Sequence, residues 1–171
     1  MKEKNNNFLF SLNRFGIKVG LHRTRALLKK CGDPHKKINF IHIAGTNGKG
    51  STLTYISSIL TESGFSVDSY TSPHLVNFNE RIKIGKNGYQ EDIDDVSLEE
   101  IMLECEHVND GDPITIFELI TAAAFLKFSN TKSDFLILET GLGGRLDATN
   151  VIKNPLVSVI TPIGIDHQQF L

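Results

Sequence analysis

Residues 38–52, "INFIHIAGTNGKGST", decide the fold of this sequence. The segment 38–44 is mostly apolar and rich in β-branched side chains, which predicts a buried strand. A glycine-rich stretch follows, and a helical pattern of apolar residues begins after Ser51. In such a strand, loop and helix unit, glycines let the backbone fold tightly, and N–H groups and the positive helix N-terminus face an anion.

The loop departs from the common phosphate-binding pattern, which has a glycine, four free positions and then Gly-Lys-Ser/Thr. Here Ile43 occupies the position of the first glycine, and Gly50 separates Lys49 from Ser51. Lys49 still offers a positive charge to phosphate oxygens, and the Ser51 hydroxyl can ligate Mg²⁺. The alternative is an ordinary glycine-rich turn, but a lysine and a serine at a helix start favour a nucleotide site.

The rest of the chain alternates between strand and helix patterns. Further apolar runs of strand length occupy residues 65–71, 134–140 and 155–161. Helical periodicity occupies residues 51–63, 98–108 and 115–128. The last of these is apolar nearly all round, which predicts a helix buried against the sheet, whereas "NERIKIGKNGYQ" (79–90) predicts a small hairpin. The alternation predicts an α/β fold of three layers with a mostly parallel sheet.

The apolar faces of two helices can be read from spacing. In the helix predicted at 51–63, Leu53, Ile56, Ile59 and Leu60 fall on one face, and Gly64 suits a C-terminal cap. The helix predicted at 98–108 carries a similar face, formed by Leu98, Ile101, Met102 and Cys105. We expect both faces to pack on the core.

Composition limits the classes of function. The chain has 171 residues, of which 40% are hydrophobic, enough for one domain with a core. Its 18 Lys and Arg against 20 Asp and Glu exclude the broad basic field of nucleic-acid and anionic-membrane binding proteins. No apolar run reaches the roughly 18 residues of a spanning helix, and the start lacks a signal peptide's apolar stretch. We expect a cytoplasmic protein in which Cys31 and Cys105, without CxxC spacing, are structural thiols.

Polar residues follow each apolar run. In an open parallel sheet, ligands bind beyond the carboxyl ends of the strands, so these residues are candidates. Ser72 follows the second run and is held extended by the proline after it. Asp166 and His167 follow the fourth run. Alone, a Ser-Pro pair is typical of a turn and a single histidine is usually structural. Because these residues follow successive strands, their placement together favours a binding site.

Glu139 closes the third run, where nucleotide-binding folds often place an acidic metal ligand. Pairing with Arg145 is an equally weighted alternative. The stretch 139–150, "ETGLGGRLDATN", is richer in glycine and polar groups than a simple connection requires. Its Asp147 and Asn150 have the hydrogen-bonding capacity for a small-ligand pocket.

Five motifs occur in register and in order between residues 20 and 171: "HIAGTNGKGST", "TSPHLVNFNERI", "TIFELITAAAF", "ETGLGGRLDATN" and "ITPIGIDHQQFL". Together they closely resemble the N-terminal ATPase domain of bacterial folylpolyglutamate synthase/dihydrofolate synthase, within the Mur ligase superfamily. The resemblance implies a domain like the Mur ligase central domain, with a P-loop-type nucleotide site. In this superfamily, the glycine loop takes the form seen here.

The resemblance also implies roles for individual residues. The ATP-binding residues would be Asn47, Gly48, Lys49, Gly50, Ser51 and Thr52. Two Mg²⁺ ions would be surrounded by Ser51, Ser72, Glu139 and His167. Lys49, Glu139 and His167 would form the catalytic group. The folate substrate would meet Leu21, Arg23, Thr115, Ile116, Phe117, Glu118, Leu146, Asp147 and Ala148.

The implied reaction is an ATP-dependent ligation. ATP phosphorylates a carboxylate of dihydropteroate, of a reduced folate such as tetrahydrofolate, or of both, and the amine of L-glutamate attacks the acyl phosphate to give an amide. In the family, a lysine-bearing segment follows the "DH" motif, and a C-terminal domain helps to bind ATP and glutamate. Residues 1–171 are therefore expected to be a truncated N-terminal ATP- and folate-binding domain, inactive alone and a monomer at full length.

Two other classes stay open. A nucleotide-binding module without ligase activity would keep the glycine loop and lose the reaction. A peptidoglycan-precursor ligase would share the superfamily's loop, but "TIFELITAAAF" and "GLGGRLDATN" favour a pterin substrate. The sequence does not distinguish dihydropteroate from tetrahydrofolate as the preferred substrate.

Overall fold

The computed structural model describes residue 16, residues 18–166 and residues 168–169. Within this part of the chain, one sheet has the strand order β4-β3-β2-β5-β1-β6. Its parallel strands are β2 (Val67–Tyr70), β5 (Phe135–Glu139), β1 (Phe40–Ala44) and β6 (Val157–Ile160). The hairpin β3 (Ile82–Lys86) and β4 (Tyr89–Asp92) joins β2 in antiparallel orientation. The predicted mostly parallel sheet is confirmed.

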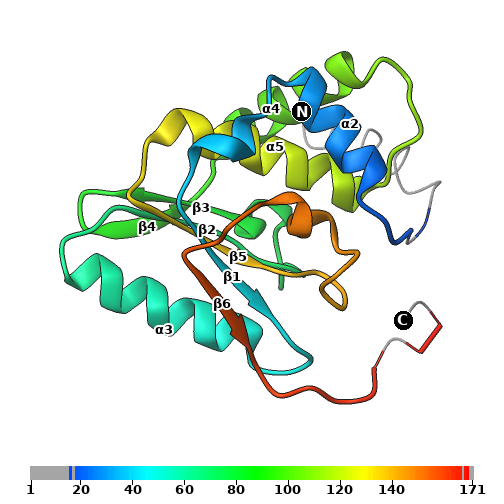
Figure 1. Ribbon diagram of the computed structural model, residues 1–171. Coiled ribbons are helices and arrows are strands. Elements are labelled where there is room, and N and C mark those ends of the chain that lie inside the picture. The colour runs from blue at the N-terminus through cyan, green and yellow to red at the C-terminus, as the bar shows by residue number, and fades with distance from the viewer. Residues whose placement is uncertain (1–15, 17, 167, 170–171) are drawn as a thin grey trace.

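Helices cover both faces of the sheet, so the fold has three layers (Figure 1). One face carries α3 (Lys49–Glu62). The other carries α2 (His22–Lys30), α4 (Asp95–Asn109) and α5 (Ile116–Thr131). Short 3-10 helices lie at η2 (Pro34–Lys37), η3 (Phe78–Arg81) and η4 (Ala148–Val151). None of the helices in the described ranges combines the length and apolarity that a bilayer span requires.

The alternation of side chains along β5 divides the core into two clusters. Ile137 packs with Ile41, Ile43 and Leu53 on the α3 side. Leu136 and Leu138 belong to the larger cluster beneath the three helices of the opposite layer. Successive strand residues point to opposite faces, so an apolar run buried on both sides reads as continuous in the sequence.

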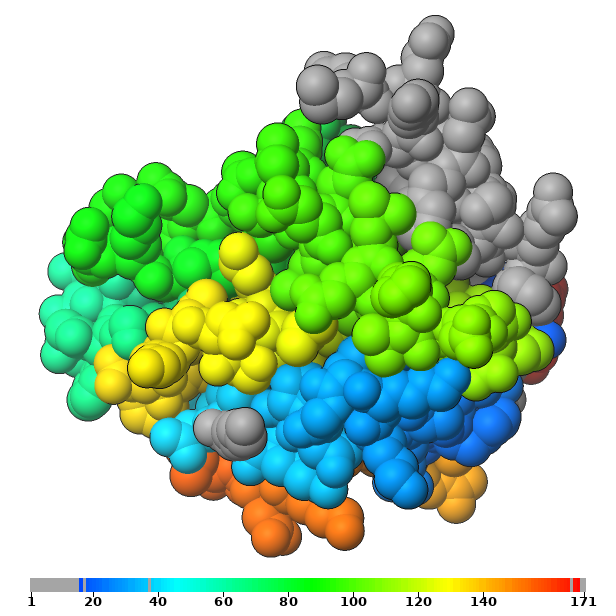
Figure 2. All heavy atoms as spheres, turned by 90° about the horizontal axis from the view of Figure 1, so that it is seen from above, coloured from blue at the N-terminus to red at the C-terminus, as the bar shows by residue number. Residues whose placement is uncertain are grey.

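The helix predicted to be buried is α5, whose side chains are mostly inaccessible from Glu118 to Phe125. It packs against α2 and α4, and Figure 2 views this layer from outside, with the blue residues of α2 beside the green residues of α4. The helix begins with a capping box in which Thr115 and Glu118 satisfy each other's N–H groups. Cover by neighbouring helices explains why the α5 sequence shows no polar face.

The predicted apolar face is confirmed for α4 and only in part for α3. On α4, the expected Leu98, Ile101, Met102 and Cys105 are all buried. On α3, Leu53 is buried and Ile56 and Leu60 pack against the core, but Ile59 is 65% exposed, so its predicted place on the face is wrong. Ile59 lies about 100° round the helix from Leu60, which carries it off the sheet. The predicted cap is confirmed, because Gly64 has φ 90° and follows the last turn.

The predicted hairpin is also confirmed. Asn87 and Gly88 form its turn, with φ of 51° and 85°. Two consecutive positive φ values match the right-handed twist of the flanking strands, which is why an Asn-Gly pair favours this turn.

Candidate functional site

The carboxyl ends of the four parallel strands lie at one edge of the sheet. Register places Ile43 opposite Glu139 and Ala44 opposite Ile160. The glycine loop after β1, Ser72 after β2 and the 139–150 stretch after β5 therefore meet, as the strand-end argument predicts.

The glycine loop is tied to the segment after β6. The N–H groups of Thr46 and Asn47 donate to the Pro162 carbonyl at 3.0 and 3.4 Å. The Thr46 hydroxyl donates to the Gly164 carbonyl at 3.1 Å and accepts from the Gly164 N–H at 2.9 Å. A side chain at Gly45, where φ is 137°, would place its Cβ 2.1 Å from the Thr161 hydroxyl. Only glycine fits this close approach.

Helix α3 starts directly from the loop. Gly48 is its N-cap with φ 82°, and no side chain caps the helix. Lys49 lies over the loop, where its Nζ donates to the carbonyls of Gly45 and Thr46 at 3.0 and 3.3 Å. Ser51 is exposed and Thr52 half-buried in the first turn. These predicted ATP-binding residues thus form one surface of N–H groups, hydroxyls and a lysine, which suits phosphate.

Glu139 faces this helix start. Its side chain is 6% exposed, and a Cβ on Gly50 would stand 3.7 Å from its Oε2. The Ser72 N–H donates to Oε2 at 3.4 Å. Burial raises the pKa of Glu139, while the Ser72 N–H and the charge of Lys49 act to lower it. No ion pair between Glu139 and Arg145 is found among the described residues, so the alternative pairing is wrong.

An oxygen atom suited to a hard cation lies beside Glu139. The hydroxyl of Ser72, whose N–H donates to Glu139, is buried and has no hydrogen-bond partner among the described residues. A buried hydroxyl without a partner is rare, and together with a carboxylate it fits a Mg²⁺ ion, which prefers oxygen. His167, the fourth predicted ligand, lies outside the described residues. Within those residues, no three His, Cys, Asp or Glu side chains cluster as a metal site on their own.

Two cavities adjoin at this edge. The first, the loop cavity, has a volume of about 430 Å³ and is lined by residues that include Gly45, Thr46, Lys49, Gly164 and Asp166. The second, the α5 cavity, has a volume of about 430 Å³ and lies over the start of α5. Their linings share Ser72, Pro73, Gly141 and Leu142. These four residues form a common wall, at which the two cavities adjoin.

Most of the residues predicted to contact folate line the α5 cavity. They are Thr115, Ile116, Phe117, Glu118, Leu146, Asp147 and Ala148. Leu21 and Arg23 are not in the lining. Leu21 packs against the core cluster under the helices, and Arg23 forms an ion pair with Glu118. Both therefore support the wall of the cavity from behind.

Glu118 is committed to protein partners. Its carboxylate accepts from the N–H and the hydroxyl of Thr115, each at 2.9 Å. Arg23 Nε donates to both Glu118 oxygens at 2.9 Å, and Arg23 Nη2 lies 2.8 Å from Oε1. A carboxylate this buried is stable only when it is paired and hydrogen-bonded. Glu118 thus fixes the start of α5 to α2.

Asp147 organises the 139–150 stretch. One oxygen accepts from the N–H groups of Gly141 and Leu142 at 3.0 and 2.9 Å. The other accepts from the N–H and the hydroxyl of Thr149 at 3.0 and 2.6 Å. Burial raises the pKa of Asp147, and these hydrogen bonds act to lower it. Its carboxylate thus holds the wall between the cavities, and Asn150 likewise bonds within the loop, to the Arg145 carbonyl at 3.1 Å.

The Asp147 network continues to β1. His42 Nε2 lies 2.9 Å from the Thr149 hydroxyl. Burial lowers the pKa of His42 to about 4, so the ring is neutral at pH 7. Because the Thr149 hydroxyl donates to Asp147, it accepts from His42, which places the proton on Nε2.

Sequence reasoning missed part of the wall. Pro73, Gly141 and Leu142 line both cavities, and Arg81 lines the α5 cavity. Gly141 could have been found, because a glycine beside a predicted binding motif signals close approach: a Cβ there would stand 2.4 Å from the Phe117 ring. Nothing local distinguishes Arg81 from a surface residue of the hairpin.

Comparisons with known proteins agree with this geometry. No family model matches the chain. The dihydrofolate synthase/folylpolyglutamate synthase of Bacillus subtilis is 45% identical over 162 residues, which cover 92% of this chain and 37% of the relative. The dihydrofolate synthetase of Saccharomyces cerevisiae is 40% identical over 159 residues, covering 91% of this chain and 36% of its own length.

Solved structures are similar as well. The folylpolyglutamate synthase of Thermotoga maritima matches with a TM-score of 0.84 and 40% identity over 95% of this chain and 38% of its own. Escherichia coli FolC in complex with DHPP and ADP matches with a TM-score of 0.86 and 36% identity over 96% of this chain and 39% of its own.

The three-layer fold and its glycine loop define an α/β domain of the Mur ligase type. Within that class, the chain belongs to the dihydrofolate synthase/folylpolyglutamate synthase family. It spans little more than a third of the length of these relatives, 37% for the Bacillus protein.

Proposed function

We propose that this chain forms the ATP- and folate-binding part of a ligase that joins L-glutamate to dihydropteroate, to a reduced folate, or to both. The observation that carries the proposal is the common wall between the loop cavity and the α5 cavity. Solved relatives were studied with DHPP and ADP, with AMPPCP and folate, and with Mn, AMPPNP and L-glutamate. Two cavities that touch suit a reaction in which a phosphoryl group passes from one ligand to the other.

In the proposed reaction, ATP binds with its phosphates in the loop cavity, and folate binds in the α5 cavity with a carboxylate toward Ser72. A carboxylate oxygen attacks the γ-phosphorus, the bond to the β,γ-bridging oxygen breaks, and ADP leaves. The amine of glutamate then attacks the carbonyl carbon of the acyl phosphate, phosphate leaves, and the nitrogen loses a proton. Positioning and charge neutralisation suffice for this chemistry, so no protein nucleophile is needed.

Each group at the helix start has a task in this scheme. Lys49 and the N–H groups from Gly48 to Ser51 stabilise the charge that develops on the transferring phosphoryl group. Ser51, Ser72 and Glu139, together with His167, would hold two Mg²⁺ ions. When bound, these ions would neutralise the negative charge of the β- and γ-phosphates. The buried, unpartnered Ser72 hydroxyl supports this assignment.

The α5 cavity suits the flat ring of a pterin. Ile116, Phe117 and Leu146 give it apolar surface, and Gly141 lies directly against the Phe117 ring. Binding of an aromatic ligand in such a cavity relies on buried apolar area with a few oriented polar groups. Thr115 and Ala148 complete the wall near the start of α5 and η4.

The partners and setting belong to the same proposal. Dihydropteroate or reduced folate, ATP and L-glutamate are the small-molecule partners, and neither nucleic acid nor a membrane is involved. In a ligase of the relatives' length, residues beyond this chain would supply the glutamate site. We propose that the ligase acts as a cytoplasmic monomer.

Calorimetry with Mg-ATP and with dihydropteroate tests the proposal. Both ligands should bind the 171-residue chain. Lys49→Ala should weaken Mg-ATP binding by a charge-assisted contact of about 1.5 to 3 kcal/mol and leave dihydropteroate binding unchanged. Lys153→Ala, at an exposed position outside both linings, is the matched control. Binding of Mg-ATP without dihydropteroate would favour a nucleotide-binding module, and equal Mg-ATP affinity in the Lys49 variant would contradict the assigned loop.

A further inference from the structure

Arg81 occupies a distinctive place at the end of the sheet. In the antiparallel pairing of β2 with β3, Tyr70 stands opposite Ile82, and the Thr71 N–H donates to the Arg81 carbonyl at 2.9 Å. Arg81 is thus fixed beside Thr71, one residue before Ser72 of the common wall. Its side chain lines the α5 cavity. The guanidinium therefore belongs to the end of that cavity that adjoins the loop cavity.

The side chain is held by its neighbours. Arg81 Nε donates to His74 Nδ1 at 3.0 Å, and the guanidinium carbon lies 5.3 Å from the centre of the Phe78 ring. His74 and Phe78 are themselves in edge contact, with ring centres 5.4 Å apart. Stacking on an aromatic ring and a fixed Nε contact leave the planar head of an arginine oriented before any ligand arrives.

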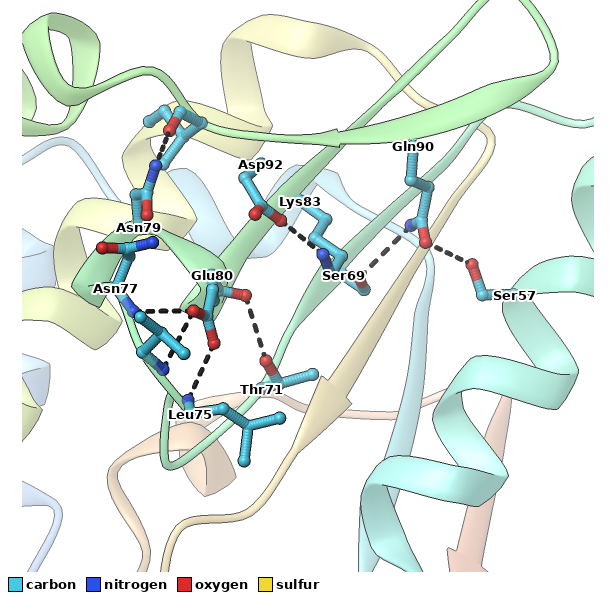
Figure 3. A network of polar contacts seen from close by, with 12 residues as sticks. Ser57, Ser69, Thr71, Leu75, Asn77, Asn79, Glu80, Lys83, Gln90 and Asp92 are labelled. Atoms are coloured by element: carbon cyan, nitrogen blue, oxygen red, sulfur yellow. Dashed lines mark hydrogen bonds and ion pairs between the residues drawn. The ribbon is translucent and has the colours of Figure 1, made fainter.

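The loop that carries His74 is fixed by Glu80, as Figure 3 shows. The Glu80 carboxylate accepts the N–H groups of Leu75, Val76 and Asn77 at 2.7, 3.0 and 2.6 Å. These hydrogen bonds lower the pKa of Glu80, which keeps it ionised at neutral pH. The segment between Ser72 and Arg81 is thus a closed loop rather than a loose connection.

The charges around the α5 cavity single out this arginine. The carboxylates in its lining, Glu118 and Asp147, are already bonded to protein groups. Among the described lining residues, Lys18 and Arg81 carry the positive charge. The Lys18 carbonyl accepts a hydrogen bond from Arg23 of α2, so Lys18 lies on the α2 side of the cavity. Arg81 is the cation next to Ser72.

We propose that the Arg81 guanidinium binds the substrate carboxylate that becomes phosphorylated and holds it at the wall shared with the loop cavity. This inference rests on the proposed function and names the residue that selects a ligand with a carboxylate at that end. A planar guanidinium can bind a carboxylate through two parallel N–H···O bonds, which fixes the direction of the attacking oxygen as well as its position.

The test compares two ligands and three proteins by calorimetry. The ligands are pteroate and its carboxamide, which differ only at the carboxylate. The proteins are the 171-residue chain, Arg81→Gln and the control Lys83→Gln, which removes a nearby positive charge that pairs with Asp92 outside the cavity. The wild type and the control should bind pteroate at least about tenfold more tightly than the carboxamide, as expected for a charge-assisted pair. Arg81→Gln should bind both ligands equally, with the carboxamide affinity of the wild type.

The outcomes separate the inference from the proposed function. Undiminished preference for pteroate in Arg81→Gln would overturn the inference and leave the proposed function standing. Failure of the wild type to bind either ligand would overturn both. Carboxamide binding shows that Arg81→Gln is folded; if it is not, Arg81→Lys decides, because a point charge should reduce the preference and an unchanged preference would contradict the bidentate role.

Discussion

At the scale of single residues, the wall between the two cavities depends on glycine at position 141. A Cβ there would meet the Phe117 ring at 2.4 Å, well inside the contact distance between two carbon atoms. Gly144, three residues later, has room, since its Cβ would stand 3.8 Å from that of Ala44. Position 144 therefore has room for a side chain, whereas position 141 does not.

Gly141→Ala should therefore displace Phe117 and lower the stability of the chain by about 1 to 3 kcal/mol, as overpacking does. It should also weaken dihydropteroate binding more than Mg-ATP binding, because Phe117 lines only the α5 cavity. Chemical denaturation and calorimetry measure the two effects. Gly144→Ala is the matched control and should be close to wild type; a variant pair with equal losses would contradict the close-packing argument.

Glu139 illustrates how a buried carboxylate can oppose stability. Burial raises its pKa in the folded chain, so the folded state favours the protonated acid more than the unfolded state does. The favourable contribution to folding is present below the unfolded pKa and is lost as the pH rises through the folded one. At pH 7 the ionised group therefore opposes folding.

Glu139→Gln should leave the midpoint of thermal unfolding unchanged or raise it when no metal is present, because the amide keeps the size and removes the buried charge. Mg²⁺-dependent nucleotide affinity should fall, since a cation then has one anionic ligand less. Melting curves with EDTA and titrations with and without Mg²⁺ give the two readouts. A strong loss of stability in EDTA would show instead that the Glu139 charge supports the fold.

At the scale of elements, the contact between α2 and α5 is an ion pair. The Arg23 side chain is 17% exposed and that of Glu118 2% exposed. The charge of Glu118 is therefore compensated by a residue 95 positions away in sequence. Loss of the cation would leave a buried anion.

Arg23→Met should lower the free energy of unfolding by about 3 kcal/mol, because breaking a buried pair leaves the remaining charge without its partner. The double variant Arg23→Met with Glu118→Gln should recover part of that loss. Urea denaturation of the wild type, both single variants and the double variant forms a complete cycle. Strict additivity of the two single effects would indicate that the residues do not stabilise each other.

The sequence predicted most elements, and its failures have physical causes. Apolar runs identified β1, β2 and β5, which are buried between the two helical layers. An apolar run also identified β6, although this edge strand is mostly exposed. Helix α2 was missed, because only Thr24, Leu27 and Leu28 of its residues are buried and no side-chain cap marks its start. A short helix with basic residues looks like a solvated segment until its partner α5 is in place.

The candidate site likewise contains residues that local patterns predict and residues that depend on tertiary contacts. The glycine loop, Ser72 and Glu139 stand at strand ends, where topology alone places them together. Leu21 and Arg23 were assigned by the resemblance and are not among the described lining residues of the α5 cavity, because their contacts are with the core and with Glu118. The position of Arg81 beside the cavity depends on the pairing of β2 with β3, which no local sequence pattern predicts.

At the scale of the whole molecule, the described residues form the loop cavity and the α5 cavity, for which we propose ATP and folate. The glutamate site is proposed to come from residues beyond this chain. The chain spans 37% of the Bacillus relative. We therefore predict that the purified 171-residue chain makes no labelled amide from Mg-ATP, dihydropteroate and labelled glutamate at a useful rate. Slow ATP hydrolysis should persist, because water needs no glutamate site. Turnover near the ~10 s⁻¹ of a median enzyme would contradict this division of the site.

The common wall also makes the two binding equilibria interdependent. Gly141 and Leu142 face both cavities and are held by a single carboxylate, that of Asp147. A ligand in either cavity would contact this backbone, so a shift that one ligand causes there would change the site of the other. By linkage, the factor by which nucleotide tightens folate binding equals the factor by which folate tightens nucleotide binding. Coupling between the two proposed ligands would thus pass through a stretch of two residues, with no moving domain required to transmit it.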